Sequence, residues 1–165
     1  MVEMHLAAVR VELPTNTPIL LLQEATGARR TLPIYIGADV ATAIAYALQG
    51  VQTARPMTHD LMRDLLTELG ATLDRVLITE LRESTFFAEL HLTIGGQVHT
   101  VSSRPSDAIA LAVRLGSGIY ADDALIDAEG VVLAPESDDD SPEAEELVEQ
   151  FSEFIKTIRP EDFSG

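Results

Sequence analysis

The sequence predicts an α+β fold, in which helices and a C-terminal amphipathic helix accompany a mainly antiparallel or mixed β-sheet. Three observations support this class. Strand-like segments come in two runs, helical segments follow each run instead of alternating with single strands, and tight-turn signals join neighbouring strands. A chain of 165 residues is also long enough to enclose one such core.

The first run of strands covers residues 4–13, 18–24 and 29–36. The middle segment, PILLLQE, has a continuous apolar stretch that is typical of a strand buried on both faces. The sequence PTNT at 14–17 is a turn signal. Pro33 cannot donate a hydrogen bond to a neighbouring strand, so we expect it at an edge, a bulge or a strand end.

Two helices are predicted next, at 37–49 and 58–69. The first repeats apolar residues at helical spacing on one face: Val40, Ile44, Ala47 and Leu48. In the second, Thr58 is a good N-cap residue. Three leucines of this helix are expected to face the core: Leu61, Leu65 and Leu69. Gly50 and Gly70 follow the two helices, as is usual for residues that end a helix.

The second run of strands comprises residues 72–81, 85–94 and 97–103. Gly95 and Gly96 supply the positive φ angles that a tight hairpin turn requires. A third helix is predicted at 108–115, a short strand at 118–120 and an acidic turn at 121–127.

The sequence divides into three parts. Residues 1–133 are expected to form one folded domain, 134–143 an acidic linker and 144–165 a C-terminal helix and tail. The linker, APESDDDSPE, lacks the apolar residues that a packed core needs. Beyond it, apolar residues recur on one helical stripe: Leu147, Val148, Phe151, Phe154, Ile155 and Ile158. This stripe needs a surface to cover, either on its own domain or on a neighbouring subunit.

The charge of the chain argues against a broad face for nucleic acid. The net charge is −16, and residues 134–165 hold eleven acidic residues against Lys156 and Arg159. The preceding 133 residues hold sixteen acidic residues, nine arginines and no lysine. An acidic surface repels a polyphosphate, so a nucleic-acid role has to rest on a local arginine site or on bound metal.

Other features of the composition concern the cellular compartment. The chain has no cysteine, which excludes disulfides and thiolate metal sites. Its first residues do not resemble a signal peptide, and no apolar run approaches the about 20 residues that span a bilayer. We therefore expect a cytoplasmic protein without a membrane partner.

The segment SSRPSDAIALAVRLG, residues 102–116, has a simple structural interpretation. Pro105 suits the first helical position, where its missing N–H costs nothing. Asp107 is favourable in the first turn, and a nearby serine can cap the helix. Helix initiation thus explains this motif except for Arg104.

The alternative interpretation is a site for an anion. The guanidinium of Arg104 suits phosphate or carboxylate, and a helix N-terminus beside it offers free N–H groups. Arg55 precedes a proline in the same way, with His59 and Asp60 at the start of the next helix. An imidazole moves protons near neutral pH, and a carboxylate can orient it or bind a hard cation. A solvent-facing His59 is an equally good interpretation, and the sequence leaves both open.

Four sequence blocks, in this order, resemble the bifunctional nuclease domain family. They are LPIYIGADVATAIAYALQG, RPMTHDLMRDLLTELGA, VLITELRESTFFAELHL and SSRPSDAIALAVRLGSGIY. The resemblance covers about residues 1–133. It implies an α+β fold, hydrolysis of phosphodiester bonds in DNA and RNA, and self-association into a dimer or larger homo-oligomer.

The polar blocks of that family fall on seven residues of this chain. The expected catalytic residues are His59, Asp60, Arg104 and Asp107. The expected substrate-binding residues are Arg55, Thr58 and Ser106. A divalent cation such as Mg²⁺, held by Asp60 or Asp107, is the candidate cofactor.

A second function class stays open on the sequence alone. The chain is then a non-enzymatic oligomeric module, whose arginines bind an anionic ligand or a protein partner without catalysis. A shared anion site requires residues 55–60 and 104–107 to lie side by side.

Overall fold

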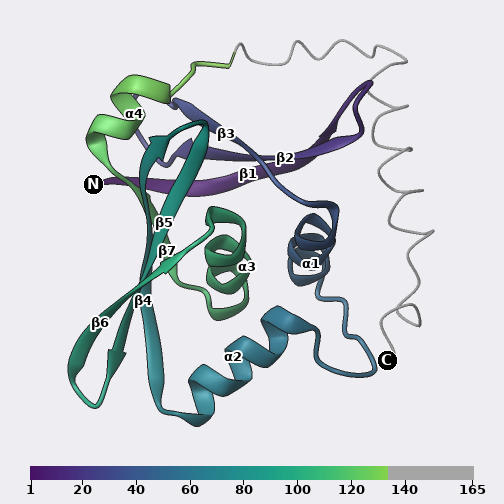
Figure 1. The fold of residues 1–165 in the computed structure, drawn as a ribbon, viewed down its shortest axis with the longest axis vertical. Coiled ribbons are helices and arrows are strands. Elements are labelled where there is room, and N and C mark those ends of the chain that lie inside the picture. The colour runs from purple at the N-terminus through teal and green to yellow at the C-terminus, as the bar shows by residue number, and fades with distance from the viewer. Residues whose placement is uncertain (134–165) are drawn as a thin grey trace.

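A computed structural model describes residues 1–133, which form seven strands and four helices (Figure 1). The strands are β1 (Val2–Glu12), β2 (Thr17–Glu24), β3 (Thr31–Tyr35), β4 (Ala71–Arg82), β5 (Thr85–Ile94), β6 (Gln97–Ser103) and β7 (Gly118–Ala121). The helices are α1 (Ala38–Gln49), α2 (Thr58–Glu68), α3 (Pro105–Leu115) and α4 (Asp123–Glu129). The predicted α+β class is confirmed. The predicted linker at 134–143 and the helix and tail at 144–165 lie outside the described residues.

The two halves of the sheet are joined by its shortest strand. The strand order is β3-β2-β1-β7-β4-β5-β6. β7 pairs antiparallel with β1 and parallel with β4, whereas the other neighbouring strands are antiparallel to each other. Within β7, Ile119 lies between Met4 and Val76. The meanders β1–β3 and β4–β6 therefore become one mixed sheet through β7.

Local sequence features explain the strand ends and turns. Pro33 lies in β3, which is an edge strand, as expected for a residue that cannot donate to a neighbour. Gly95 and Gly96 have φ angles of 57° and 81°, and the turn they form pairs Ile94 with Gln97. The expected tight hairpin turn is confirmed, and its loop has two residues. In place of the acidic turn expected at 121–127, the chain forms helix α4.

The core lies between one face of the sheet and helices α1, α2 and α3 (Figure 1). In the middle of β5, alternate side chains are buried on this face: Ala88, Leu90 and Leu92. Helix α3 is the most deeply buried, because residues 108–112 are each at most 1% exposed. Three of these five residues are alanine, which allows α1 to pack closely against α3.

Helix α2 differs from the prediction in its N-cap and its buried face. Its N-cap residue is Met57, and Thr58 is the first helical residue. The three leucines expected in the core are 51%, 52% and 70% exposed: Leu61, Leu65 and Leu69. The face toward the core instead carries His59, Met62 and Leu66. Residues four positions apart drift about 40° around a helix, so the spacing of the leucines did not by itself select the buried face.

The end of α4 leads to a first prediction. A Cβ atom on Gly130 would lie 2.5 Å from the carbonyl oxygen of Ile126 and 3.2 Å from Cβ of Arg30. Because the closest atom belongs to the backbone, we expect Gly130→Ala to lower the free energy of unfolding by about 1–3 kcal/mol in urea titrations. Glu129→Ala, one residue earlier at an exposed position, is the control and should leave this free energy nearly unchanged. Equal stability of the two variants would contradict the close packing at Gly130.

Candidate functional site

The first turns of α2 and α3 meet at a contact between a histidine and an aspartate. Nε2 of His59 lies 2.9 Å from Oδ1 of Asp107, although 48 positions separate the two residues in the sequence. A carboxylate can only accept at this distance, so Nε2 is the donor when it carries the proton. The segments 55–60 and 104–107 are therefore neighbours at this point.

Arg104 extends this contact to the surface. Its Nε donates to Oδ2 of Asp107 at 2.7 Å, and its Nη2 donates to Oδ1 at 3.1 Å. The side chains are 72% exposed for Arg104, 23% for Asp107 and 8% for His59. The three residues thus form a chain of polar contacts from solvent to the interior, which we name the Arg104–Asp107–His59 network.

The environment keeps Asp107 ionised at neutral pH. Burial raises the pKa of its carboxyl group, but hydrogen bonds from Arg104 and His59, together with their charges, outweigh burial and lower this pKa below its usual value. An ionised carboxylate holds both the guanidinium and the imidazole in place.

Helix initiation explains only part of the RPSD motif. Arg104 occupies the N-cap position with an extended backbone, and Pro105 is the first helical residue, as expected. No side-chain hydrogen bond caps the helix. The carboxylate of Asp107 accepts from Arg104 and His59, so these contacts, and not a cap, determine how it is placed.

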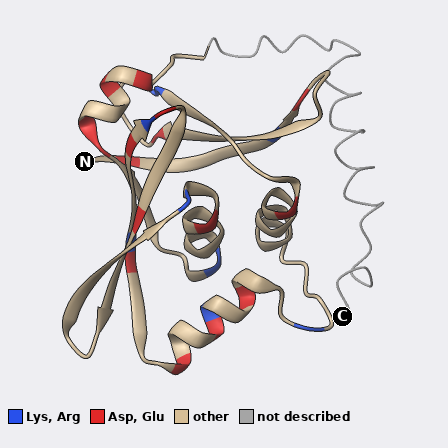
Figure 2. Ribbon diagram, in the orientation of Figure 1, with Lys and Arg blue, Asp and Glu red and all other residues tan. Residues whose placement is uncertain are grey.

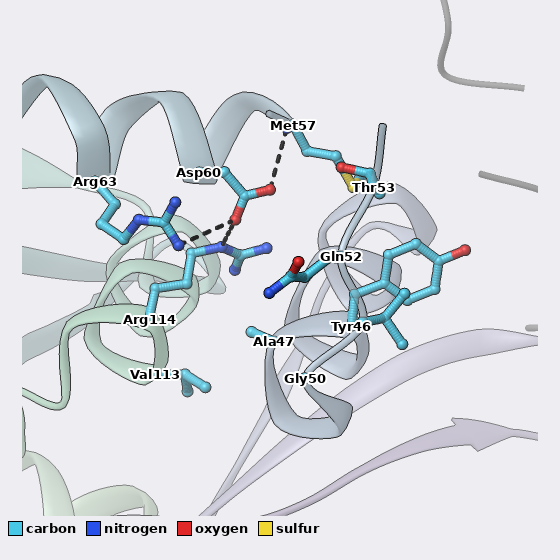
Figure 3. Close-up of a pocket in the computed structure, with 11 residues that line it drawn as sticks. Tyr46, Ala47, Gly50, Gln52, Thr53, Met57, Asp60, Arg63, Val113 and Arg114 are labelled. Atoms are coloured by element: carbon cyan, nitrogen blue, oxygen red, sulfur yellow. Dashed lines mark hydrogen bonds and ion pairs between the residues drawn. The ribbon is translucent and has the colours of Figure 1, made fainter. Parts of the chain in front are cut away.

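Asp60 points into a different pocket, shown in Figure 3. Its Oδ1 accepts from Nε of Arg114 at 2.7 Å, and its Oδ2 accepts from the backbone N–H of Met57 at 3.1 Å. Burial raises the pKa of Asp60, but the hydrogen bonds from Arg114 and Met57 outweigh it, so this pKa lies below its usual value. The pocket has a volume of about 220 Å³ and is also lined by Gln52 and Arg63. Although Asp60 and His59 are adjacent in sequence, Asp60 contacts Arg114 whereas His59 contacts Asp107.

Arg114 is a polar residue that the sequence interpretation missed. Its side chain is only 4% exposed. Besides its bond to Asp60, it donates to the carbonyl oxygens of Ala43 at 2.9 Å and Ala110 at 3.0 Å. It therefore links α3 to both α1 and α2. A single arginine inside the apolar stretch AIALAVRLG was the available signal.

A second pocket, with a volume of about 400 Å³, lies beside Arg104. Three segments line it: the junction of β3 and α1, the turn between β4 and β5, and the start of α3. The lining residues are Ile34, Tyr35, Ile36, Gly37, Ser84, Thr85, Phe86, Arg104, Pro105 and Ser106. We name it the Arg104 pocket.

The three expected substrate-binding residues are not together. Ser106 is 7% exposed and lines the Arg104 pocket. Arg55 and Thr58 are exposed, in the loop before α2 and at its first residue, and line neither pocket. Of the seven residues expected at the site, the structure gathers His59, Arg104, Ser106 and Asp107.

The expected carboxylate ligands do not present a cation site in this arrangement. Both oxygens of Asp107 and both of Asp60 already accept hydrogen bonds, and an arginine is a donor in each case. Within residues 1–133, no three or more histidine, aspartate or glutamate side chains are grouped so that they could hold a metal ion. The positive charge at each carboxylate comes from arginine.

Residues 20–134 match the model of the family described as Bifunctional nuclease domain. The chain belongs to the bifunctional nuclease domain family. Both polar segments of the site, 55–60 and 104–107, lie inside the matched region. The resemblance inferred from the four sequence blocks is confirmed, and a nuclease-like function is supported at the level of the family.

Relatives of this family member occur in bacteria and plants. The chain is 46% identical to uncharacterized protein Rv1829 of Mycobacterium tuberculosis strain H37Rv, across 99% of this chain and 98% of that protein. It is 33% identical to bifunctional nuclease 2 of Arabidopsis thaliana, across 61% of this chain and 31% of that protein. It is 31% identical to bifunctional nuclease 1 of the same plant, across 59% of this chain and 31% of that protein. The aligned part therefore spans under a third of each of these two plant proteins.

A membrane-spanning helix is not found among the described residues. None of the helices in residues 1–133 has both the length and the apolar character needed to cross a bilayer.

Proposed function

We propose that the chain hydrolyses phosphodiester bonds of DNA and RNA at the Arg104 pocket. The observation that carries this proposal is the Arg104–Asp107–His59 network, whose exposed member, Arg104, lines that pocket. Membership of a family with plant members named bifunctional nucleases supports the reaction class.

Arg104 is the residue that would bind the phosphate. Its bonds to Asp107 use Nε and Nη2, so Nη1 faces away from this pair on a side chain that is 72% exposed. A guanidinium in this position stabilises the negative charge that develops on phosphate oxygens in the transition state. The hydroxyl of Ser106, in the same pocket, can donate a further hydrogen bond.

His59 would act as a positioning residue, because its side chain is 8% exposed and it does not line the Arg104 pocket. Its Nε2 contacts Asp107, and Asp107 in turn holds the guanidinium of Arg104. The attacking water oxygen bonds to phosphorus and releases a proton to solvent, the bond from phosphorus to the leaving oxygen breaks, and the leaving oxygen takes up a proton from solvent. The general-base role expected for His59 from the sequence is therefore not carried into this proposal.

Charge supports a local site over an extended one. Among the described residues the arginines are dispersed over several elements, and acidic residues lie between them (Figure 2). Binding would therefore depend on one phosphate held by Arg104, and not on a continuous basic face.

The test measures the initial rate of cleavage of end-labelled DNA and RNA, with Mg²⁺ and separately with EDTA. We expect Arg104→Ala to reduce the rate by about 100–1,000-fold, the usual effect of removing one donor to a transition-state oxyanion. Arg29→Ala is the matched control, because Arg29 is also an exposed arginine with a bond to one neighbour, Gln23. Its rate should equal that of the wild type.

Two outcomes would contradict the proposal in different ways. Full activity of Arg104→Ala would exclude this site while leaving the activity itself in place. Binding of nucleic acid without any cleavage by the wild type would instead favour the non-enzymatic alternative, in which Arg104 and Ser106 hold an anion without catalysis. The expected homo-oligomer, the cytoplasmic location and the domain division after residue 133 stay predictions.

A further inference from the structure

The Arg104 pocket has a mixed lining that the phosphate contact does not use. Only one strongly basic side chain, Arg104, lines it. Most of its remaining lining residues are apolar or aromatic, among them Tyr35, Ile36, Phe86 and Pro105. A phosphate group alone needs no such surface, so the pocket is suited to a ligand that joins an anionic group to a flat apolar group.

Two aromatic rings provide the flat surface. Tyr35, at the end of edge strand β3, is 59% exposed, which is high for a large aromatic residue. The side chain of Glu12, which interacts with its hydroxyl, raises the pKa of the tyrosine. Phe86, on β5, is half-buried and packs against the core. Aromatic rings in a groove are the usual stacking platforms for unpaired bases.

The size of the pocket fits one nucleoside-sized group. Its volume of about 400 Å³ falls in the range of about 300–1,000 Å³ that is typical of small-ligand sites. A base inside a duplex is stacked on both faces and cannot enter such a pocket without leaving its helix. The pocket therefore selects against paired bases.

Charge around the pocket restricts the contact further. Asp39, in the first turn of α1, acts electrostatically on Arg104, and Glu12 lies beside Tyr35. These carboxylates would repel additional phosphates on either side. A ligand that binds through one phosphate and one stacked base avoids this repulsion, whereas a backbone with several bound phosphates does not.

We infer that the Arg104 pocket binds an unpaired nucleobase by stacking on Tyr35 and Phe86, with the adjoining phosphate on Arg104. The substrate class is then single-stranded DNA or RNA. This inference rests on the proposed function for the identity of the ligand, but it concerns binding and can be tested without cleavage.

The experiment measures equilibrium binding of the full chain to a short oligonucleotide that contains one 2-aminopurine, whose fluorescence falls when the base stacks. Single-stranded DNA, single-stranded RNA, the corresponding duplexes and a free mononucleotide are compared in EDTA. We expect both single strands to bind more tightly than the duplexes, and the free mononucleotide, which carries one base and one phosphate, to compete with the single strands for the same pocket. The slope of log K against log salt should be shallow, near about −0.7, the value for one neutralised phosphate on a single strand.

Matched variants test the two rings. Tyr35→Leu and Phe86→Leu are each expected to weaken single-strand binding by about 5–150-fold, as loss of one stacking partner does. Tyr35→Phe keeps the ring and should bind like the wild type. Phe87→Leu is the control for Phe86, because Phe87 is the next residue, lies under the guanidinium of Arg82 at 4.3 Å and does not line the pocket. Because Tyr35 is largely exposed, its variants keep the test valid if Phe86→Leu does not fold.

The outcomes separate this inference from the nuclease proposal. Wild-type affinity in Tyr35→Leu, equal affinity for duplex and single strand, or failure of the free mononucleotide to compete with the single strand would each overturn the inference. If duplex is cleaved at the same rate as single strand and Tyr35→Leu is fully active, the nuclease proposal stands and the inference about the base pocket is wrong. If single-strand binding depends on the two rings but no cleavage occurs, the inference about the pocket stands and the nuclease proposal is wrong.

Discussion

Replacing Arg114 with methionine is expected to lower the free energy of unfolding by about 3–5 kcal/mol, the usual effect of removing one partner of a buried ion pair. Arg114 is 4% exposed and donates to Asp60 on α2 and to the carbonyl oxygen of Ala43 on α1. Methionine has a similar stem but no donor, so both acceptors lose their partner inside the protein. Urea titrations followed by circular dichroism measure the difference.

Arg63→Met is the matched control for this prediction. Arg63 is also near Asp60, but its side chain is 39% exposed and its short contact, 2.7 Å, is with Asp64. Exposed pairs of this kind contribute about 0–1 kcal/mol. If Arg63→Met and Arg114→Met unfold at the same urea concentration, the buried link between the three helices does not stabilise the fold as we describe.

The same substitution should change the response to acid. The pKa of Asp60 is lowered in the folded protein, so the unfolded chain binds more protons in acid. The stability contributed by the pair is therefore complete above the ordinary pKa of 3.8 and is lost as the pH falls through the lowered value. The difference in unfolding free energy between wild type and Arg114→Met should shrink across this acid range. A constant difference would show that Asp60 is not the partner that matters.

The second large effect is expected in the core of α3. Leu111 is fully buried, and Leu111→Ala should lower the free energy of unfolding by about 2–5 kcal/mol through lost apolar contacts and a cavity. Leu65→Ala removes the same atoms from α2, where the side chain is 52% exposed, and should change this free energy by no more than about 0.5 kcal/mol. Thermal and urea unfolding of both variants give the comparison.

This pair of leucines also tests the orientation of α2. If Leu65→Ala is as destabilising as Leu111→Ala, Leu65 lies in the core and the leucine face expected from the sequence is correct after all. If only Leu111→Ala is destabilising, the buried face of α2 is the one that carries His59.

Much of the fold could be predicted because its signals are local. The apolar run of β2, the paired glycines between β5 and β6, and the glycines after α1 and α3 each determine structure within a few residues. The face of α2 was predicted wrongly because two neighbouring faces of this helix carry apolar residues. Which of the two faces is buried depends on where the sheet and Asp107 lie, and both are far from α2 in the sequence.

The site could be predicted only in part for the same reason. That His59 meets Asp107 depends on how α2 and α3 pack, which no local pattern encodes. The separation of His59 from Asp60 was accessible in principle, because consecutive helical residues point about 100° apart. The buried position of Arg114 was hard to predict, because an arginine in the last turn of a helix ordinarily interacts with the helix dipole at the surface.

The position of β7 has a consequence for the order in which the protein can fold. The meanders β1–β3 and β4–β6 each contain only contacts between neighbouring segments, so each can begin to form as soon as it leaves the ribosome. Within the sheet, no strand of one meander pairs with a strand of the other until the four residues of β7 are synthesised and inserted between β1 and β4. In a nascent chain that stops before Gly118, only the packing of α1 and α2 against α3 connects the two half-sheets, and each half-sheet keeps an unpaired strand edge that β7 later covers.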